Sequence, residues 1–175
     1  IHSEVEPPSS PGPRLERSWV AVVFAGILLQ VILGGAVRHL GAGPSCGYEL
    51  LSCGSAGLWP GAGPMALEQR MNMVHRFFGV LLLAGVLKVS WTSRRLALER
   101  GRDTLGRFAL VPAVLVVIQV GLGLGTVAGF RISSLMVRVP VVALHTAIGG
   151  LLLASLLVLY LSAGPLLSSD DGGPA

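Results

Sequence analysis

The chain has 175 residues, of which 52% are apolar and only 13% are charged. A soluble globular domain carries roughly 25% charged residues, so this chain has too few to cover its surface in water. The composition argues against a water-soluble enzyme, a nucleic-acid-binding protein and a disordered chain, although the net charge is +4 and the pI is about 9.8.

Four apolar runs are each long enough to cross a membrane, which takes about 20 residues. In chain order they are Trp19 to Val37, Met73 to Trp91, Phe108 to Phe130 and Val139 to Leu161. Pro112 and Pro140 fall in the first turns of the third and fourth runs, where a missing N–H costs least. We expect an all-α membrane protein with a polar tail at 1–17, a four-helix transmembrane domain at 18–162 and a second polar tail at 163–175.

Positive charge is concentrated on one side of the predicted membrane domain, and Lys and Arg in short loops mark the cytoplasmic side. The N-terminal tail and the loop between the second and third runs contain Arg14, Arg17, Arg94, Arg95, Arg100, Arg102 and Arg107. Trp19, Trp91 and Tyr160 fall on the same side, as expected for an interfacial aromatic belt. We therefore expect both termini in the cytoplasm of a bacterial or archaeal cell and the loop at 38–72 outside its cytoplasmic membrane.

This outer loop contains the only two cysteines of the chain, Cys46 and Cys53. An even pair of cysteines in an oxidising compartment favours a structural disulfide. Redox-active thiols and free thiols are the alternatives. Two cysteines without nearby histidines make a poor zinc site.

The chain also contains an internal repeat. The segments 75–84 and 145–154 share the pattern H-x3-G-x-L-L-L-A, and the Gln-x3-Gly of 30–34 matches that of 119–123. The separation from glutamine to histidine is 45 residues in one copy and 26 in the other, because the cysteine loop is inserted in the first. The repeat predicts a four-helix bundle of two pseudo-symmetric helical hairpins, related by an axis along the membrane normal.

His75 and His145 are the only histidines within the predicted spans. Ionisable residues inside a membrane are costly and are functional by default. Two neutral imidazoles that face each other across a bundle suit axial ligation of a haem iron. Gly79 and Gly149 follow the two histidines by four residues, on the same helix face, and leave room for a flat macrocycle. A proton-relay pair and structural hydrogen bonds are the alternatives.

Three arginines near the outer boundary are candidates to pair with haem propionates: Arg38, Arg76 and Arg138. Interfacial snorkelling explains each of them about equally well. His39, at the outer end of the first run, is predicted to be a solvated loop residue rather than a third ligand.

From Gln30 to Leu161 these residues resemble the heme A synthase family, the cytochrome oxidase assembly proteins of membranes. The stretch from Gly34 to Cys46 resembles the family's G-G-x-V-R-x-T-G-S-G-x-x-C motif, and the two cysteines have the C-x6-C spacing of its outer-loop disulfide. His75-Arg76 resembles the His-Arg pair that opens the family's second helix, and the A-L-H ending at His145 resembles that of its fourth.

Members of this family commonly have eight spans in two fused halves, one implied to hold the substrate haem and the other a haem b. The four spans here resemble one half, and a homodimer would restore the symmetry. Asn72 stands three residues before His75, where the synthase-active half has a glutamate, and an amide cannot act as an acid or base. Glu68 lies one helical turn further out as a possible substitute. The loop lacks the family's Trp-Pro, which puts contacts with a haem-delivery partner in doubt.

The resemblance implies a haem-binding protein of haem A biosynthesis, which oxidises a methyl group of haem O with electrons from a quinol or a partner protein. The alternative is a bis-His haem b cytochrome subunit that transfers electrons in a respiratory membrane complex, without synthase activity because Asn72 replaces the glutamate. A second alternative is a cofactor-free membrane scaffold. Haem b is the expected cofactor, with haem O or haem A as alternatives. The expected partners are membrane lipid, quinol, and respiratory or oxidase-assembly proteins, with no nucleic acid.

Overall fold

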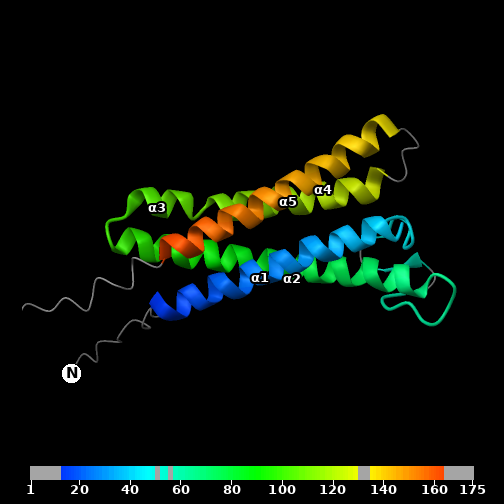
Figure 1. Ribbon diagram of the computed structural model, residues 1–175, viewed down its shortest axis with the longest axis horizontal. Helices are drawn as coiled ribbons and strands as arrows, with labels where there is room; N and C mark the ends of the chain where they lie inside the picture. The colour runs from blue at the N-terminus through cyan, green and yellow to red at the C-terminus, as the bar shows by residue number, and fades with distance from the viewer. Residues whose placement is uncertain (1–12, 50–51, 55–56, 130–134, 164–175) are drawn as a thin grey trace, which may run out of the picture.

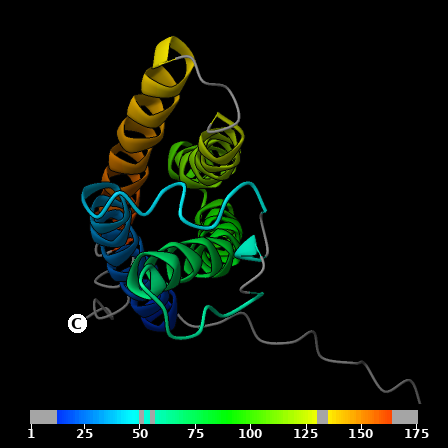
Figure 2. The same cartoon turned by 90° about the vertical axis from the view of Figure 1, so that its right-hand side faces the viewer.

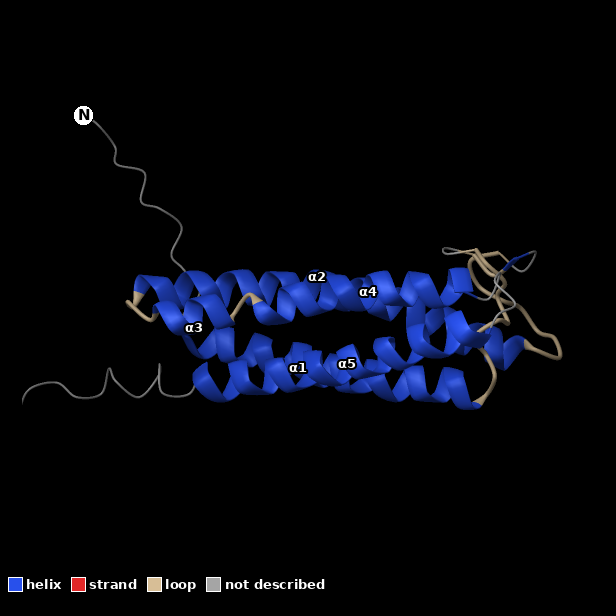
Figure 3. Ribbon diagram, turned by 90° about the horizontal axis from the view of Figure 1, so that it is seen from above, coloured by secondary structure: helices blue, strands red, loops and turns tan. Residues whose placement is uncertain are grey.

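The computed structural model describes residues 13–49, 52–54, 57–129 and 135–163. These residues form five helices: α1 (Pro13–His39), α2 (Ala66–Glu99), α3 (Asp103–Phe108), α4 (Val111–Gly129) and α5 (Leu135–Ala163). The described part of the chain contains no strand (Figures 1 and 3). The predicted all-α fold is therefore confirmed, whereas most of the two predicted tails lies outside the described residues.

Four stretches of helix are long and apolar enough to cross a membrane: Arg17–His39, Ala66–Glu99, Asp103–Gly129 and Met136–Ser162. They contain the first, second and fourth predicted spans and the third as far as Gly129. At the other ends they extend further, because helix-forming polar residues continue the backbone hydrogen bonding beyond the apolar run. Outward-facing side chains such as Ile32, Leu81 and Leu151 are exposed. A bundle with this much exposed apolar surface is suited to lipid, so the protein is an integral membrane protein.

The third predicted span is divided in the structure. Phe108 ends α3, and α4 begins at Val111, so the helix does not run continuously from Phe108 as we expected. Pro112 lies in the first turn of α4, and its missing N–H cannot bond to the carbonyl oxygen of Phe108. The break between the two helices therefore falls where the proline permits a new first turn. The predicted end of this span, Phe130, lies outside the described residues.

The position of Pro140 also differs from the prediction. Helix α5 begins at Leu135, so Pro140 lies inside the helix rather than in its first turn. Because proline has no N–H, the carbonyl oxygen of Met136 lacks its helical donor. The missing bond lies near the helix end, where few others depend on it.

The helices form two hairpins that pack side by side. Helix α1 packs against α2 and α4 against α5, while α1 also contacts α5 and α2 contacts α4. The four long helices thus stand in a ring with α2 diagonally opposite α5 (Figure 2). The start of α1, the end of α5 and α3 lie at one end of the bundle, and the loop between α1 and α2 lies at the other (Figure 1). This is the predicted arrangement of two hairpins with the same orientation.

The apolar core occupies the part of the bundle away from that loop. Its buried members are Val20, Val23, Ile27, Leu82, Val86, Val89, Ala109, Val116, Leu152, Leu156 and Leu159. At the same end, the Arg17 guanidinium lies 4.7 Å from the ring centre of Tyr160, and the Lys88 ammonium lies 4.3 Å from that of Trp19. These cation–π contacts join α1 to α5 and α2. The two histidines lie outside this core, toward the loop end of the bundle.

Candidate functional site

The two histidines of the repeat lie on diagonally opposite helices, His75 on α2 and His145 on α5. Both side chains are half-buried. Each ring packs against a glycine of the other helix in its hairpin. A Cβ atom built on Gly34 would lie 3.0 Å from Cε1 of His75, and one built on Gly123 would lie 3.3 Å from Cε1 of His145. A larger residue at either position would push the ring away by a few tenths of an ångström.

The glycines that follow the histidines make a reciprocal contact. A Cβ atom built on Gly79 would lie 3.0 Å from Nε2 of Gln30, and one built on Gly149 would lie 3.0 Å from Nε2 of Gln119. We expected a macrocycle to use the space beside Gly79 and Gly149; in the structure a glutamine amide lies there. Each hairpin thus repeats the same pair of contacts. The histidine of one helix packs against a glycine of the other helix, and the glutamine of that other helix packs against a glycine of the histidine's helix.

The hydrogen bonds of the two units differ. The Nδ1 atom of His145 lies 3.1 Å from the main-chain oxygen of Gln119, and its Nε2 atom lies 3.4 Å from the Gln119 side-chain nitrogen. In the other hairpin, the Gln30 side chain donates a 2.8 Å hydrogen bond to the main-chain oxygen of His75. The Nδ1 atom of His75 is buried and has no hydrogen-bond partner among the described residues. The repeat is therefore matched in packing but not in its polar contacts.

The two imidazoles are the type of donor that a haem iron would take. The described residues contain no group of three or more His, Cys, Asp or Glu side chains able to hold a bare metal ion. Buried polar atoms normally have partners, yet His75 Nδ1 and the side-chain oxygens of Gln30 and Gln119 have none in the described residues. Unpaired polar atoms around the two imidazoles fit a bound group that the described part of the chain does not supply.

The three candidate propionate partners lie in different surroundings. Arg76 donates to the main-chain oxygen of Glu49, and its second terminal nitrogen is buried without a partner among the described residues. Arg38 is exposed near the end of α1, and the side chain of Arg138 packs beside Gly129, with Cγ 3.7 Å from a Cβ built there. Arg76 is therefore the best placed of the three, since it follows His75 and has an unused, buried N–H group.

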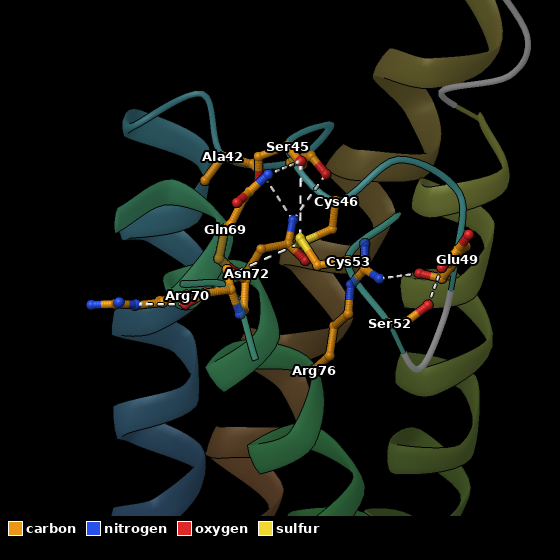
Figure 4. Close-up of a disulfide and its surroundings, with 12 residues drawn as sticks. Ala42, Ser45, Cys46, Glu49, Ser52, Cys53, Gln69, Arg70, Asn72 and Arg76 are labelled. Carbon is orange, nitrogen blue, oxygen red and sulfur yellow. Dashed lines mark hydrogen bonds between the residues drawn. A yellow bond between two sulfur atoms is a disulfide. The ribbon is translucent and has the colours of Figure 1, made fainter. Parts of the chain in front are cut away.

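Asn72 ties the outer loop to α2. Its side chain is only 4% exposed, and its nitrogen donates to the main-chain oxygens of Ala42 at 2.6 Å and Gly43 at 2.9 Å (Figure 4). One turn earlier, Glu68 has a buried carboxylate oxygen with no partner among the described residues. The amide of Asn72 therefore has a structural role that a glutamate at this position could not perform, because a carboxylate has no N–H to donate.

The loop is also closed on itself by a disulfide between Cys46 and Cys53 (Figure 4). Both cysteines are buried against Met73 of α2. The side chain of Gln69 donates to the main-chain oxygen of Ser45 at 3.2 Å, which adds a second polar link between helix and loop. The disulfide therefore constrains the same loop segment that Asn72 and Gln69 link to α2 by hydrogen bonds.

We expect the double change Cys46→Ser/Cys53→Ser to lower the free energy of unfolding by about 2 kcal/mol, since the bridge closes a short loop. Thermal unfolding in mild detergent measures this loss. Reductant should lower the melting temperature of the wild type and leave the double variant unchanged. Equal stability of the oxidised wild type and the double variant would show that the bridge contributes nothing to the fold.

Residues 2–161 match the sequence model of the COX15-CtaA family, described as cytochrome oxidase assembly protein. The chain belongs to this family. Over 117 residues it is 37% identical to the heme A synthase of Symbiobacterium thermophilum, which covers 66% of this chain and 34% of that protein. The chain thus spans about a third of the length of this curated relative. No solved structure matches the chain.

Membership of the cytochrome oxidase assembly family confirms the resemblance found in the motifs around His75 and His145. Gln30, Gln119, Gly34 and Gly123 were not predicted as site residues, although the Gln-x3-Gly pattern that contains them is repeated in the sequence. That pattern lies on α1 and α4, which are the hairpin partners of the two histidine helices. Only the packing of the hairpins shows that glutamine and histidine meet.

Proposed function

We propose that this chain binds one haem between His75 and His145 and acts in haem A biosynthesis and cytochrome oxidase assembly. Membership of the assembly family supports this role. The main observation in support of haem binding is the pair of imidazoles on the diagonally opposite helices α2 and α5. Each imidazole packs against a glycine of the other helix in its hairpin. The unpaired ring nitrogen of His75 adds support, since a buried imidazole nitrogen without a hydrogen bond is available as a ligand.

In this proposal the histidines bind the iron and Arg76 uses its unpaired N–H group to hold a propionate. The haem, when bound, supplies one-electron redox chemistry whose potential depends on its ligands and their hydrogen bonds. The helices around the site hold the imidazoles in place through the ring contacts with Gly34 and Gly123. The outer loop, closed by its disulfide and fixed through Asn72, covers the same end of the bundle.

The reaction we propose for the family role is oxidation of a methyl group of haem O to the formyl group of haem A, with a quinol or a partner protein as electron donor. The relative from Symbiobacterium thermophilum is named a heme A synthase, and it is 37% identical over the matched region. The match covers 34% of that protein, and the rest of the relative lies outside the matched region.

One observation favours the second candidate, a bis-His haem b unit that transfers electrons without oxidising haem O. Asn72, at the position where the synthase-active half has a glutamate, donates both of its amide contacts to the outer loop and has no acid–base capacity. Ligation by two histidines also leaves no open position on the iron, which suits electron transfer better than oxygen chemistry.

The test is to purify the protein in mild detergent, record reduced-minus-oxidised spectra and identify the extracted haem. Low-spin haem with two axial histidines supports haem binding. Haem A or its alcohol intermediate, enriched with a haem O source, favours the synthase role, and haem b alone favours electron transfer. A folded protein that takes up no haem after reconstitution would overturn the proposal and leave a cofactor-free scaffold.

A matched pair of glycine variants tests the packing behind each ligand. Gly34→Ala places a methyl group 3.0 Å from Cε1 of His75, whereas Gly35→Ala meets no atom within 4 Å. Both changes add the same helix propensity, about 1 kcal/mol, so their difference isolates the effect on the ring. We expect Gly34→Ala to weaken haem binding by at least about tenfold, the usual effect of disturbing a ligand's support, and Gly35→Ala to leave it unchanged. Equal affinities measured by haem titration would contradict this.

The orientation is also part of the proposal: both termini in the cytoplasm and the disulfide loop outside. The cation–π pairs of Arg17 and Lys88 gather basic side chains at the end of the bundle opposite that loop. Basic residues near a membrane boundary favour the cytoplasmic side. Labelling of introduced cysteines with an impermeant reagent in intact cells, at Arg102 and at Leu58, would decide between the two orientations.

A further inference from the structure

Gln119 makes two contacts with one imidazole, and the inference drawn from them rests on the proposed haem binding. Its main-chain oxygen lies 3.1 Å from Nδ1 of His145, and its side-chain nitrogen lies 3.4 Å from Nε2 of the same ring. The amide reaches this position because Gly149 has no side chain, as a Cβ there would lie 3.0 Å from the Gln119 nitrogen. Gln119 of α4 therefore contacts both ring nitrogens of His145 on α5.

These contacts define which ring nitrogen carries the hydrogen. A carbonyl oxygen only accepts, so Nδ1 of His145 must be the N–H that points at the Gln119 main chain. A neutral imidazole then has its lone pair on Nε2, which faces the donor group of the Gln119 side chain. A hydrogen bond from the second ring nitrogen to a carbonyl is also how proteins fix the tautomer and orientation of a metal-binding histidine.

The matching residue of the other hairpin does not do this. Gln30 donates to the main-chain oxygen of His75 and not to its ring, and Nδ1 of His75 has no partner among the described residues. The two histidines therefore have equivalent places in the repeat and different constraints. The ring of His145 is fixed in tautomer and direction, whereas hydrogen bonds from the described residues do not fix the ring of His75.

We propose that Gln119 is a positioning residue for haem binding: its main chain presents Nε2 of His145 as the ligand, and its side chain covers that nitrogen until iron takes its place. A haem held at Nε2 of His145 would replace the amide contact, and His75, whose ring no hydrogen bond from the described residues fixes, would hold the haem from α2. The affinity for haem is consequently set in part by a hydrogen bond that exists only in the haem-free protein.

Two substitutions at Gln119 should act in opposite directions. Gln119→Leu removes the competing donor at similar volume, so haem should bind about two- to tenfold more tightly, the usual net effect of one hydrogen bond. Gln119→Glu replaces the donor by an acceptor, which favours a hydrogen on Nε2, and haem should bind at least about tenfold more weakly. Gln30→Leu and Gln30→Glu both lose the donation to the His75 main chain, so they should shift the affinity in one direction only.

The experiment titrates haemin into the full-length haem-free wild type and these four variants in detergent, and records the ¹⁵N spectrum of labelled histidine before haem is added. Opposite shifts for the two Gln119 variants, with an Nδ1–H tautomer for His145, support the inference. Shifts of the same sign, or a His145 tautomer with hydrogen on Nε2, overturn it. Failure of the folded wild type to bind haem would instead overturn the proposed function, and the histidine spectrum would still decide whether Gln119 fixes His145.

Discussion

Replacing either His75 or His145 with alanine is expected to abolish the low-spin haem spectrum of the purified protein. Each imidazole is one of two axial ligands in our proposal, and no other histidine lies within the spanning parts of α2 or α5. Removing one leaves an open iron position and a high-spin haem, with affinity lowered by more than about 100-fold, because loss of a direct ligand exceeds the effect of losing its support.

His39→Ala is the control for this prediction. His39 lies at the exposed end of α1, so its loss should leave the spectrum unchanged. Far-ultraviolet circular dichroism would verify that each variant keeps its helices, and added imidazole should restore part of the low-spin signal in the two ligand variants. An unchanged low-spin spectrum in folded His75→Ala or His145→Ala protein would overturn the ligand assignment.

The fold could be predicted from the sequence because its main signals are strong and local. Long apolar runs mark the membrane helices, and the repeated glutamine and histidine patterns identify the two hairpins. The helix ends could not be predicted, since hydropathy shows where lipid is needed and not where backbone hydrogen bonding stops. Pro112 divides the third span and Pro140 lies inside α5, because a proline allows a helix boundary without requiring one.

The candidate site was only partly accessible from the sequence. His75 and His145 could be selected because the repeat pairs them, but the role of the repeated glutamines depends on which helix faces meet. The space beside Gly79 and Gly149 shows this: the sequence indicates a missing side chain, and only the packing shows that an amide from the other helix lies there. Asn72 likewise reads as a lost catalytic group until its contacts with the loop are known.

The change Asn72→Glu is expected to destabilise the protein rather than restore an acid–base group. The Asn72 nitrogen supplies hydrogen bonds to the main-chain oxygens of Ala42 and Gly43, and a glutamate would remove both bonds, although the Ala42 oxygen also accepts from Ser45. The glutamate would also bring a carboxylate against these oxygens in a buried position. The two lost hydrogen bonds and a buried unpaired charge together predict a loss of roughly 2–5 kcal/mol in the free energy of unfolding.

Thermal unfolding in detergent, together with extraction of haem from cells that supply haem O, measures both consequences of this change. Asn72→Asp is the matched control, since it loses the same N–H donors without extending the side chain, and it should also destabilise the loop. If Asn72→Glu instead unfolds like the wild type and accumulates haem A or its alcohol intermediate, the loop contacts are dispensable and the carboxylate alone is missing. If it is destabilised and forms neither product, the outer loop of this chain depends on an amide at this position, and gaining the glutamate would require a different loop.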